Sequence, residues 1–144
     1  MKQTNYAKLE FLSSSANEGF ARSAAAAFCA QLDPTLDELG DIKAAVSEAV
    51  TNCIVHAYPQ TIGKISMKMR LFENNSVEIT VKDKGVGIPD IDRARQPMFS
   101  TGGDERSGMG FTIMESFMDR LSVKSKPGFG TTVIMKRRIS ARAR

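Results

Sequence analysis

Alternation of apolar and polar residues predicts a β-hairpin near the middle of this chain. Apolar residues occupy every second position of the stretches 65–71 and 77–81, and Asn74-Asn75 lies between them. Strict alternation over this length is typical of strands with one buried face, and asparagine favours the turn that joins such strands. Leu9 and Phe11 indicate a further short strand near the start of the chain.

The last third of the chain predicts a helix followed by a second hairpin. The apolar run within 109–119 indicates the helix. The segments 121–123 and 131–135 are expected to form paired strands, because the intervening stretch 126–130 holds proline and two glycines. No internal repeat and no linker divides these elements, so we expect a single domain over 1–144.

An alanine-rich helix is predicted after the first strand. Ser15 and Glu18 have the spacing of a capping box, in which each side chain binds the backbone N–H of the other residue. We therefore expect the helix to begin there. It should end near Gln31, because Asp33-Pro34 cannot continue it.

A second, longer helix is predicted to reach about Ala57. Thr35 and Glu38 form another capping box in the sequence, and one apolar stripe follows them. Glu48 and Asn52 border this stripe. The stripe consists of Leu36, Leu39, Ile42, Val46, Ala49, Val50, Cys53 and Ile54.

Length and charge exclude several classes of function. At 144 residues the chain can build one core but has no room for the transducer or effector domains of large ATPases. The net charge is +4, and much of the excess lies in the basic tail 136–144. We expect a solvated terminus there and no nucleic-acid partner, because no recognition helix or aromatic platform accompanies the tail.

The sequence predicts a cytoplasmic protein without a membrane partner. No apolar stretch approaches the length of a bilayer crossing, and the N-terminus lacks the apolar core of a signal peptide. Cys29 and Cys53 both fall on apolar helix faces. Two such thiols in a cytosolic chain are more often small buried residues than a disulfide or a metal pair.

A carboxylate and an amide lie one helical turn apart in Glu48-Ala-Val-Thr-Asn52. Side chains at positions i and i+4 share one helix face, roughly 6 Å apart along the axis. Glu48 can accept a proton, and the amide oxygen of Asn52 can bind a hard cation. Alone, such a pair is common on exposed helices, but the motifs that follow it favour an ATP site.

Two glycine motifs follow the polar pair. In Asp83-Lys-Gly85-Val-Gly87 the carboxylate can accept a hydrogen bond from the exocyclic amine of adenine, and the glycines let the backbone approach a flat base. In the second motif, backbone N–H groups at a helix start can receive phosphates. That motif consists of Ser107, Gly108, Met109 and Gly110.

The stretch 89–107 between the two glycine motifs is predicted to be a mobile lid. It shows neither the helix nor the strand period, and it contains Gly102-Gly103. Long loops inside compact domains are usually functional or disordered. Closure of this segment over ATP would exclude water from the site.

The order and spacing of these motifs resemble the ATP-binding fold shared by DNA gyrase, Hsp90, histidine kinases and MutL. From about Phe11 to Arg137 the chain looks like the anti-sigma F factor family, serine protein kinases of spore-forming bacteria. The resemblance implies an α+β fold, a two-layer α/β sandwich whose mixed, mostly antiparallel sheet carries its helices on one face. The segments that carry it are Gln31-Leu-Asp-Pro-Thr-Leu-Asp-Glu-Leu39, Val46-Ser-Glu-Ala-Val-Thr-Asn52, Ala94-Arg-Gln-Pro-Met-Phe99 and Glu105-Arg-Ser-Gly-Met-Gly-Phe-Thr-Ile-Met-Glu-Ser-Phe-Met-Asp119.

The resemblance also implies a role for each motif. Asn52 would hold Mg²⁺, Glu48 would accept the proton of an attacking serine hydroxyl, and Arg106 would reach the γ-phosphate. Backbone N–H groups of 108–110 would receive the phosphates. The residues expected around adenine are Asp83, Gly87 and Thr132.

Two protein partners follow from the resemblance. One is an RNA polymerase sigma factor held inactive, and the other is an anti-anti-sigma protein phosphorylated on serine. A homodimer is also implied. Arg22 matches the family's partner-contacting arginine on the first helix, although spacing alone favours a solvated helix charge.

Two departures from the family pattern keep alternatives open. The stretch 100–105 lacks the expected Thr-Lys-Pro run, and Ala57 replaces an expected glycine. The second departure is more typical of the related kinase of the general stress sigma factor. Further hypotheses are a binding-only module in which ATP changes partner affinity, and a stand-alone ATPase, for which the chain is too short.

Overall fold

The computed structural model describes residues 2–96 and 110–140. Among the described elements, two helices follow the first strand, and a pair of strands, two further helices and a second pair of strands come after them. A 3₁₀ turn (η1) follows the first helix and a π-helical turn (η2) follows the second. The elements are β1 (Gln3–Leu12), α1 (Asn17–Cys29), η1 (Ala30–Leu32), α2 (Leu36–Asn52), η2 (Cys53–Ala57), β2 (Lys64–Phe72), β3 (Ser76–Asp83), α3 (Ile91–Ala94), α4 (Gly110–Phe117), β4 (Arg120–Lys126) and β5 (Gly130–Arg138).

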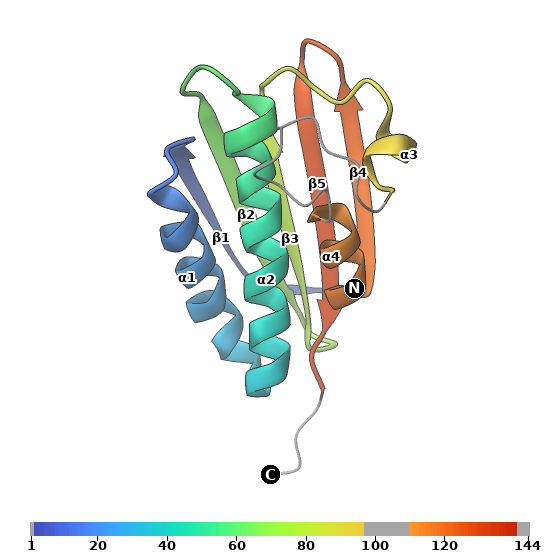
Figure 1. The fold of residues 1–144 in the computed structure, drawn as a ribbon. Helices are drawn as coiled ribbons and strands as arrows, with labels where there is room; N and C mark the ends of the chain where they lie inside the picture. The colour runs from blue at the N-terminus through green and yellow to red at the C-terminus, as the bar shows by residue number, and fades with distance from the viewer. Residues whose placement is uncertain (1, 97–109, 141–144) are drawn as a thin grey trace.

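The strands form one sheet in the order β1-β2-β3-β5-β4. Helices α1, α2 and α4 lie side by side on one face of this sheet (Figure 1). The predicted two-layer α+β sandwich is therefore confirmed. Every pairing among the described strands is antiparallel, so the parallel pairing that a mixed sheet would contain is not found there. β5 pairs with both β3 and β4, so β3 and β4 follow one another in the chain but are not neighbours in the sheet.

Both predicted hairpins are present. In the first, Met67 pairs with Val81 and Met69 with Ile79, so the alternating apolar residues share one face. Asn75 occupies the turn with a positive φ of 65°, a conformation that asparagine tolerates better than most residues. Pairing of β4 with β5 forms the second hairpin.

The core lies between the sheet and its helices. Apolar side chains from α2 and α4 meet the buried face of β2, β3 and β5, and the described methionines of these elements are part of the core. Both cysteines are buried and free, as predicted. The largest fully buried side chains include Ile42, Val46, Val50, Ile65, Met67, Met69, Ile79, Met114 and Met135.

The two predicted capping boxes have different outcomes. Thr35 Oγ1 accepts from the N–H of Glu38 at 3.0 Å, and Glu38 Oε1 accepts from the N–H of Thr35 at 2.9 Å, so the second box is confirmed. The first box is wrong. Helix α1 begins at Asn17 without a side-chain cap, because Glu18 turns instead to Arg22 in an ion pair of 2.9 Å.

Strand β1 and helix α3 differ from the predicted elements. β1 begins at Gln3, well before the apolar alternation, and its first half is exposed, so hydrophobic pattern could not reveal it. α3 lies inside the predicted lid, where the Asp90 side chain caps it by accepting from the N–H of Arg93 at 3.1 Å. The rest of the predicted lid, including Gly102-Gly103, falls in 97–109 and outside the described residues.

The long second helix reaches Ala57 as predicted, but its last turn is wider than an α-helix. In η2 the N–H of Tyr58 donates to the carbonyl of Cys53 at 3.2 Å, five residues back. Single π turns within helices are frequent at functional sites.

The end of β5 is more ordered than the predicted tail. Residues 136–138 complete the strand, Ile139 is buried, and the N–H of Ser140 donates to Glu38 Oε2 at 2.9 Å. The basic residues at 141–144 lie outside the described residues. In the described part of the chain, none of the helices has the length and apolar character to span a bilayer.

Candidate nucleotide-binding site

The polar pair and the second glycine motif meet on one side of α2. Glu48 and Asn52 are half-buried near the C-terminal end of this helix. Gly110 begins α4, and a Cβ added to it would lie 3.2 Å from Asn52 Oδ1 and 3.3 Å from Glu48 Oε2. The structure therefore brings Gly110, the one described residue of the second glycine motif, against the carboxylate and the amide.

Asp83 ends β3 with its carboxylate buried and held by several donors. Its Oδ1 accepts from the N–H of Gly85 at 2.9 Å and from the N–H of Thr131 at 3.2 Å. Its Oδ2 lies 3.4 Å from Cys53 Sγ, which donates to it. These contacts hold the carboxylate in one orientation and leave Oδ1 little capacity to accept a further hydrogen bond.

The glycines around Asp83 leave no room for a side chain. A Cβ on Gly85 would lie 2.2 Å from the carbonyl oxygen of Ala57. Gly87 has φ +79°, and its Cβ would meet the Lys126 carbonyl oxygen at 2.4 Å. Close backbone approach thus explains both glycines of the predicted adenine motif.

Thr132 is not beside Asp83. Along β5, Thr131, Val133 and Met135 are buried on the helix-covered face, so Thr132 faces the other side of the sheet. Thr131 is the residue whose N–H reaches Asp83, and its Oγ1 lies 2.8 Å from Ser125 Oγ. The period-two pattern of Val133 and Met135 was the signal that could have identified Thr131 instead of Thr132.

Cys53 and Tyr58 are neighbours of Asp83 that the sequence motifs did not identify as site residues. The Tyr58 hydroxyl donates to the Lys64 carbonyl and accepts from the N–H of Lys84, both at 2.8 Å. Burial, followed by the charge of Asp83, raises the pKa of the Cys53 thiol well above its ordinary value. Burial also raises the pKa of Tyr58. Both groups are therefore protonated near neutral pH and able to donate.

The remaining predicted residues lie elsewhere. Arg106, Ser107, Gly108 and Met109 are outside the described residues. Arg22 is on α1, which packs against α2 on the side away from α4 (Figure 1). It is therefore separated from the nucleotide motifs and is available only to a molecule that contacts α1.

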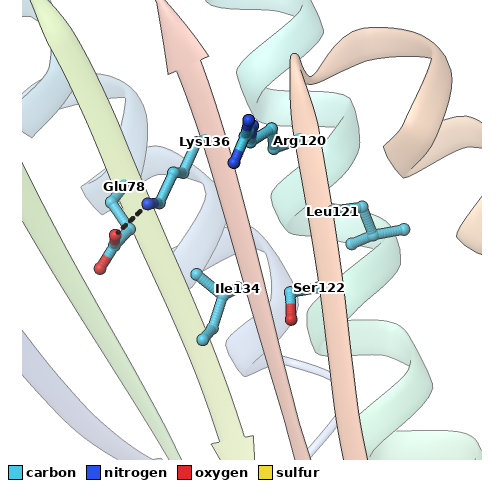
Figure 2. A pocket seen from close by; sticks show the side chains of 6 residues that line it. All are labelled: Glu78, Arg120, Leu121, Ser122, Ile134 and Lys136. Carbon is cyan, nitrogen blue, oxygen red and sulfur yellow. Dashed lines mark ion pairs between the residues drawn. The ribbon is translucent and has the colours of Figure 1, made fainter.

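A cavity of about 490 Å³ lies on the uncovered face of the sheet, away from these motifs (Figure 2). Lys136 Nζ and Glu78 Oε2 form an ion pair of 3.4 Å at its edge. Glu78, Ile134 and Lys136 alternate with the buried residues of their strands, so the cavity is separate from the candidate nucleotide site. Its lining residues are Glu78, Arg120, Leu121, Ser122, Ile134 and Lys136.

Comparison with known proteins decides the family. The family model for the histidine kinase-like ATPase domain matches residues 12–137. An anti-sigma F factor from Thermoanaerobacter sp. (strain X514) is 54% identical over 142 residues, 98% of this chain and 99% of that protein. The chain belongs to the anti-sigma F factor family. Another family member, from Geobacillus stearothermophilus, is 56% identical over 92% of each chain.

Solved structures share the fold of this anti-sigma F factor family member. The RsbU and RsbW domains of a Mycobacterium tuberculosis protein match with a TM-score of 0.70 at 19% identity, covering 98% of this chain and 34% of that chain. The mycobacterial sensor histidine kinase MprB matches with a TM-score of 0.55 at 20% identity, covering 71% of this chain and 74% of that chain. At these identities the likeness shows the fold alone.

The residues present fit the ATP that a histidine kinase-like ATPase domain uses. Asp83 supplies a buried acceptor beside tightly packed glycines, and Gly110 leaves open the space that a methyl group would fill next to Glu48 and Asn52. Within 2–96 and 110–140, no group of three or more histidine, cysteine or acidic side chains could hold a metal ion. A cation at Asn52 would therefore need its other ligands from phosphates and water.

Proposed function

We propose that this chain is an ATP-dependent serine protein kinase that also holds an RNA polymerase sigma factor inactive. The observation that carries the kinase assignment is the position of Gly110 against Glu48 and Asn52. The helix that bears this pair continues into η2, where Cys53 contacts Asp83. A base, an amide oxygen and a helix start then meet beside an adenine-binding loop. Membership of the anti-sigma F factor family supports the sigma-factor assignment.

Each residue has a defined task in this mechanism. Asp83 accepts a hydrogen bond from the adenine amine, and Asn52 holds Mg²⁺. Bound Mg·ATP supplies the phosphoryl group and neutralises its charge. Glu48 Oε2 accepts the proton of the attacking serine hydroxyl, a role that typically contributes about 10²–10⁴-fold. The N–H groups at the start of α4 orient the phosphates.

The acceptor is an anti-anti-sigma protein, and the chain acts in the cytoplasm as a homodimer in sporulating cells. Arg22 contacts the protein partners through the guanidinium N–H groups that its Nε pair with Glu18 leaves available. Arg106 senses the γ-phosphate. ATP then favours the sigma factor, and the ADP left after phosphorylation favours the anti-anti-sigma protein.

Incubation of the chain with labelled ATP, Mg²⁺ and an anti-anti-sigma protein tests this proposal. Phosphoserine on the added protein is the expected product, and the sigma factor should be retained with ATP. Partner binding without label transfer would instead identify a binding-only module. Release of phosphate without labelled protein would identify a stand-alone ATPase. Retention of a general stress sigma factor in place of a sporulation sigma factor would identify the former as the partner.

A further inference from the structure

The π turn η2 is joined to the adenine loop by contacts from several of its residues. The Cys53 thiol donates to Asp83, and the N–H of Val86 donates to the Ala57 carbonyl at 3.0 Å. Tyr58, directly after the turn, accepts from the N–H of Lys84. The turn therefore connects the helix that carries Glu48 and Asn52 to the loop that carries the adenine residues.

Cys53 contacts the oxygen of Asp83 that the backbone leaves open. Oδ1 already accepts from the backbone of Gly85 and Thr131, which limits its capacity for another donor. Oδ2 is the oxygen that remains for a base, and the thiol lies 3.4 Å from it. One donor on Oδ2 fixes the direction of its remaining lone pair. Cys53 thus acts on the atom that distinguishes one base from another.

Tyr58 holds the loop from its other side. Its hydroxyl joins the first residue of β2 to the residue after Asp83, through the Lys64 carbonyl and the Lys84 N–H. The ring is buried and packs closely on Gly63, where a Cβ would lie 2.2 Å from the ring. A tyrosine held this firmly limits movement of the backbone that carries Asp83.

Packing alone is the competing explanation, since both side chains also belong to the apolar core. It does not account for the polar atoms. A buried cysteine needs no acceptor to pack well, and Cys29 is buried at the same level with its pKa raised to about 12 by burial. Phenylalanine would fill the place of Tyr58 without bridging two backbone groups.

We propose that Cys53 and Tyr58 are positioning residues for adenine recognition, acting through Asp83 and its loop. The proposal rests on the proposed function, because it assigns specificity within the same ATP site. Since the contacts of Cys53 and Tyr58 are with Asp83 and its loop, loss of either positioning residue should affect ATP affinity and base choice more than turnover.

The chain offers matched controls, because it contains two cysteines and two tyrosines. Cys53→Ala and Tyr58→Phe are compared with Cys29→Ala and with Tyr6→Phe, whose ring is exposed. We expect each positioning variant to weaken ATP binding about 3- to 10-fold, in line with one lost hydrogen bond, and to narrow the preference for ATP over GTP. The KM for ATP should rise while kcat stays near the parent value. The control variants should match the parent, and Cys53→Ser should restore affinity because serine keeps a donor.

Calorimetric titration of the parent and variants with ATP and GTP gives the result. Equal affinities in Cys53→Ala, Tyr58→Phe and their controls would overturn the positioning role while leaving the kinase assignment intact. Failure of the parent itself to bind ATP would overturn the proposed function instead. If Cys53→Ala does not fold, Tyr58→Phe decides by the same criteria.

Discussion

The two ends of the nucleotide site are built in different ways. At the adenine end, Asp83 is buried and held by donors from several elements, and Gly85 packs against the backbone of Ala57. At the phosphate end, Glu48 and Asn52 are half-buried side chains that face Gly110. The adenine end is organised by hydrogen bonds to the backbone, whereas the phosphate end places a carboxylate and an amide against the start of a helix.

From this difference we infer which end of the proposed site controls affinity and which controls turnover. A prearranged acceptor costs little ordering when the base binds, so the adenine end should determine affinity and base choice. Groups that meet the reacting atoms should determine turnover. Variants at the two ends should therefore separate binding from phosphorylation.

Among the variants that should alter nucleotide binding, Asn52→Ala is expected to have the largest effect. Removal of the amide oxygen leaves a Mg²⁺ ion without its protein ligand, so we expect phosphorylation to fall on the order of 100-fold or more, with weaker Mg·ATP binding. Phosphorylation measured against Mg²⁺ concentration checks this. Binding of nucleotide without Mg²⁺ should change little, and an equal loss with and without the ion would contradict the metal role.

Gly85→Ala is expected to disrupt the adenine end as a whole. The added methyl would meet a carbonyl oxygen of the backbone at 2.2 Å, which must shift, at a cost of about 1–3 kcal/mol in the free energy of unfolding. Thermal denaturation and ATP titration should both show the loss. Gly40→Ala is the control, because its methyl meets no atom within 4 Å and alanine favours the helix. Equal stabilities of the two variants would contradict the close packing.

Asp83→Asn should change base choice more than fold. The parent should prefer ATP over GTP, because a carboxylate facing the guanine carbonyl leaves acceptors unpaired at about 1–3 kcal/mol each. The asparagine amide has an NH₂ donor where the carboxylate has a second oxygen. ATP affinity should therefore fall about 10-fold, and the preference for ATP over GTP should shrink. Titration with ATP and with GTP measures both affinities. Equal affinity of the parent for ATP and GTP would make the adenine assignment wrong.

The smallest expected effect lies at the start of α2, far from both ends. Burial alone would raise the pKa of Glu38, but hydrogen bonds from Thr35 and Ser140 outweigh it and lower the pKa from 4.5 to about 2. The ionised carboxylate therefore stabilises the fold above pH 4.5, and this contribution is lost as the pH falls towards 2. Glu38→Gln should lose about 1 kcal/mol at pH 7 by urea denaturation and match the parent near pH 2. A constant difference across this range would contradict the role of the charge.

Much of the fold was predictable because local patterns agree with it. Alternation identified both hairpins, and Thr35 with Glu38 identified the start of α2. The Ser15 box failed because Glu18 had a competing partner in Arg22, which spacing cannot weigh. Exposed β1 residues carry no apolar pattern, so only pairing with β2 reveals the full strand.

The site was predictable where a motif keeps its residues close in sequence. Glu48 and Asn52 share a face by helix geometry, and Asp83 with its glycines forms one loop. The contact of Gly110 with α2 depends on how α4 packs and could not be read locally. The same holds for Cys53, whose contact with Asp83 depends on how η2 packs against the end of β3.

We propose that Glu48 acts in the phosphoryl-transfer chemistry and not in the binding of ATP. Glu48→Gln keeps the size of the side chain and removes the base, so the dissociation constant for Mg·ATP should stay within about twofold of the parent. Phosphorylation of an anti-anti-sigma protein should fall about 10²–10⁴-fold. Both quantities measured on one preparation test the claim most directly. Phosphorylation close to the parent rate, or a loss of ATP binding that accounts for the lost activity, would contradict it.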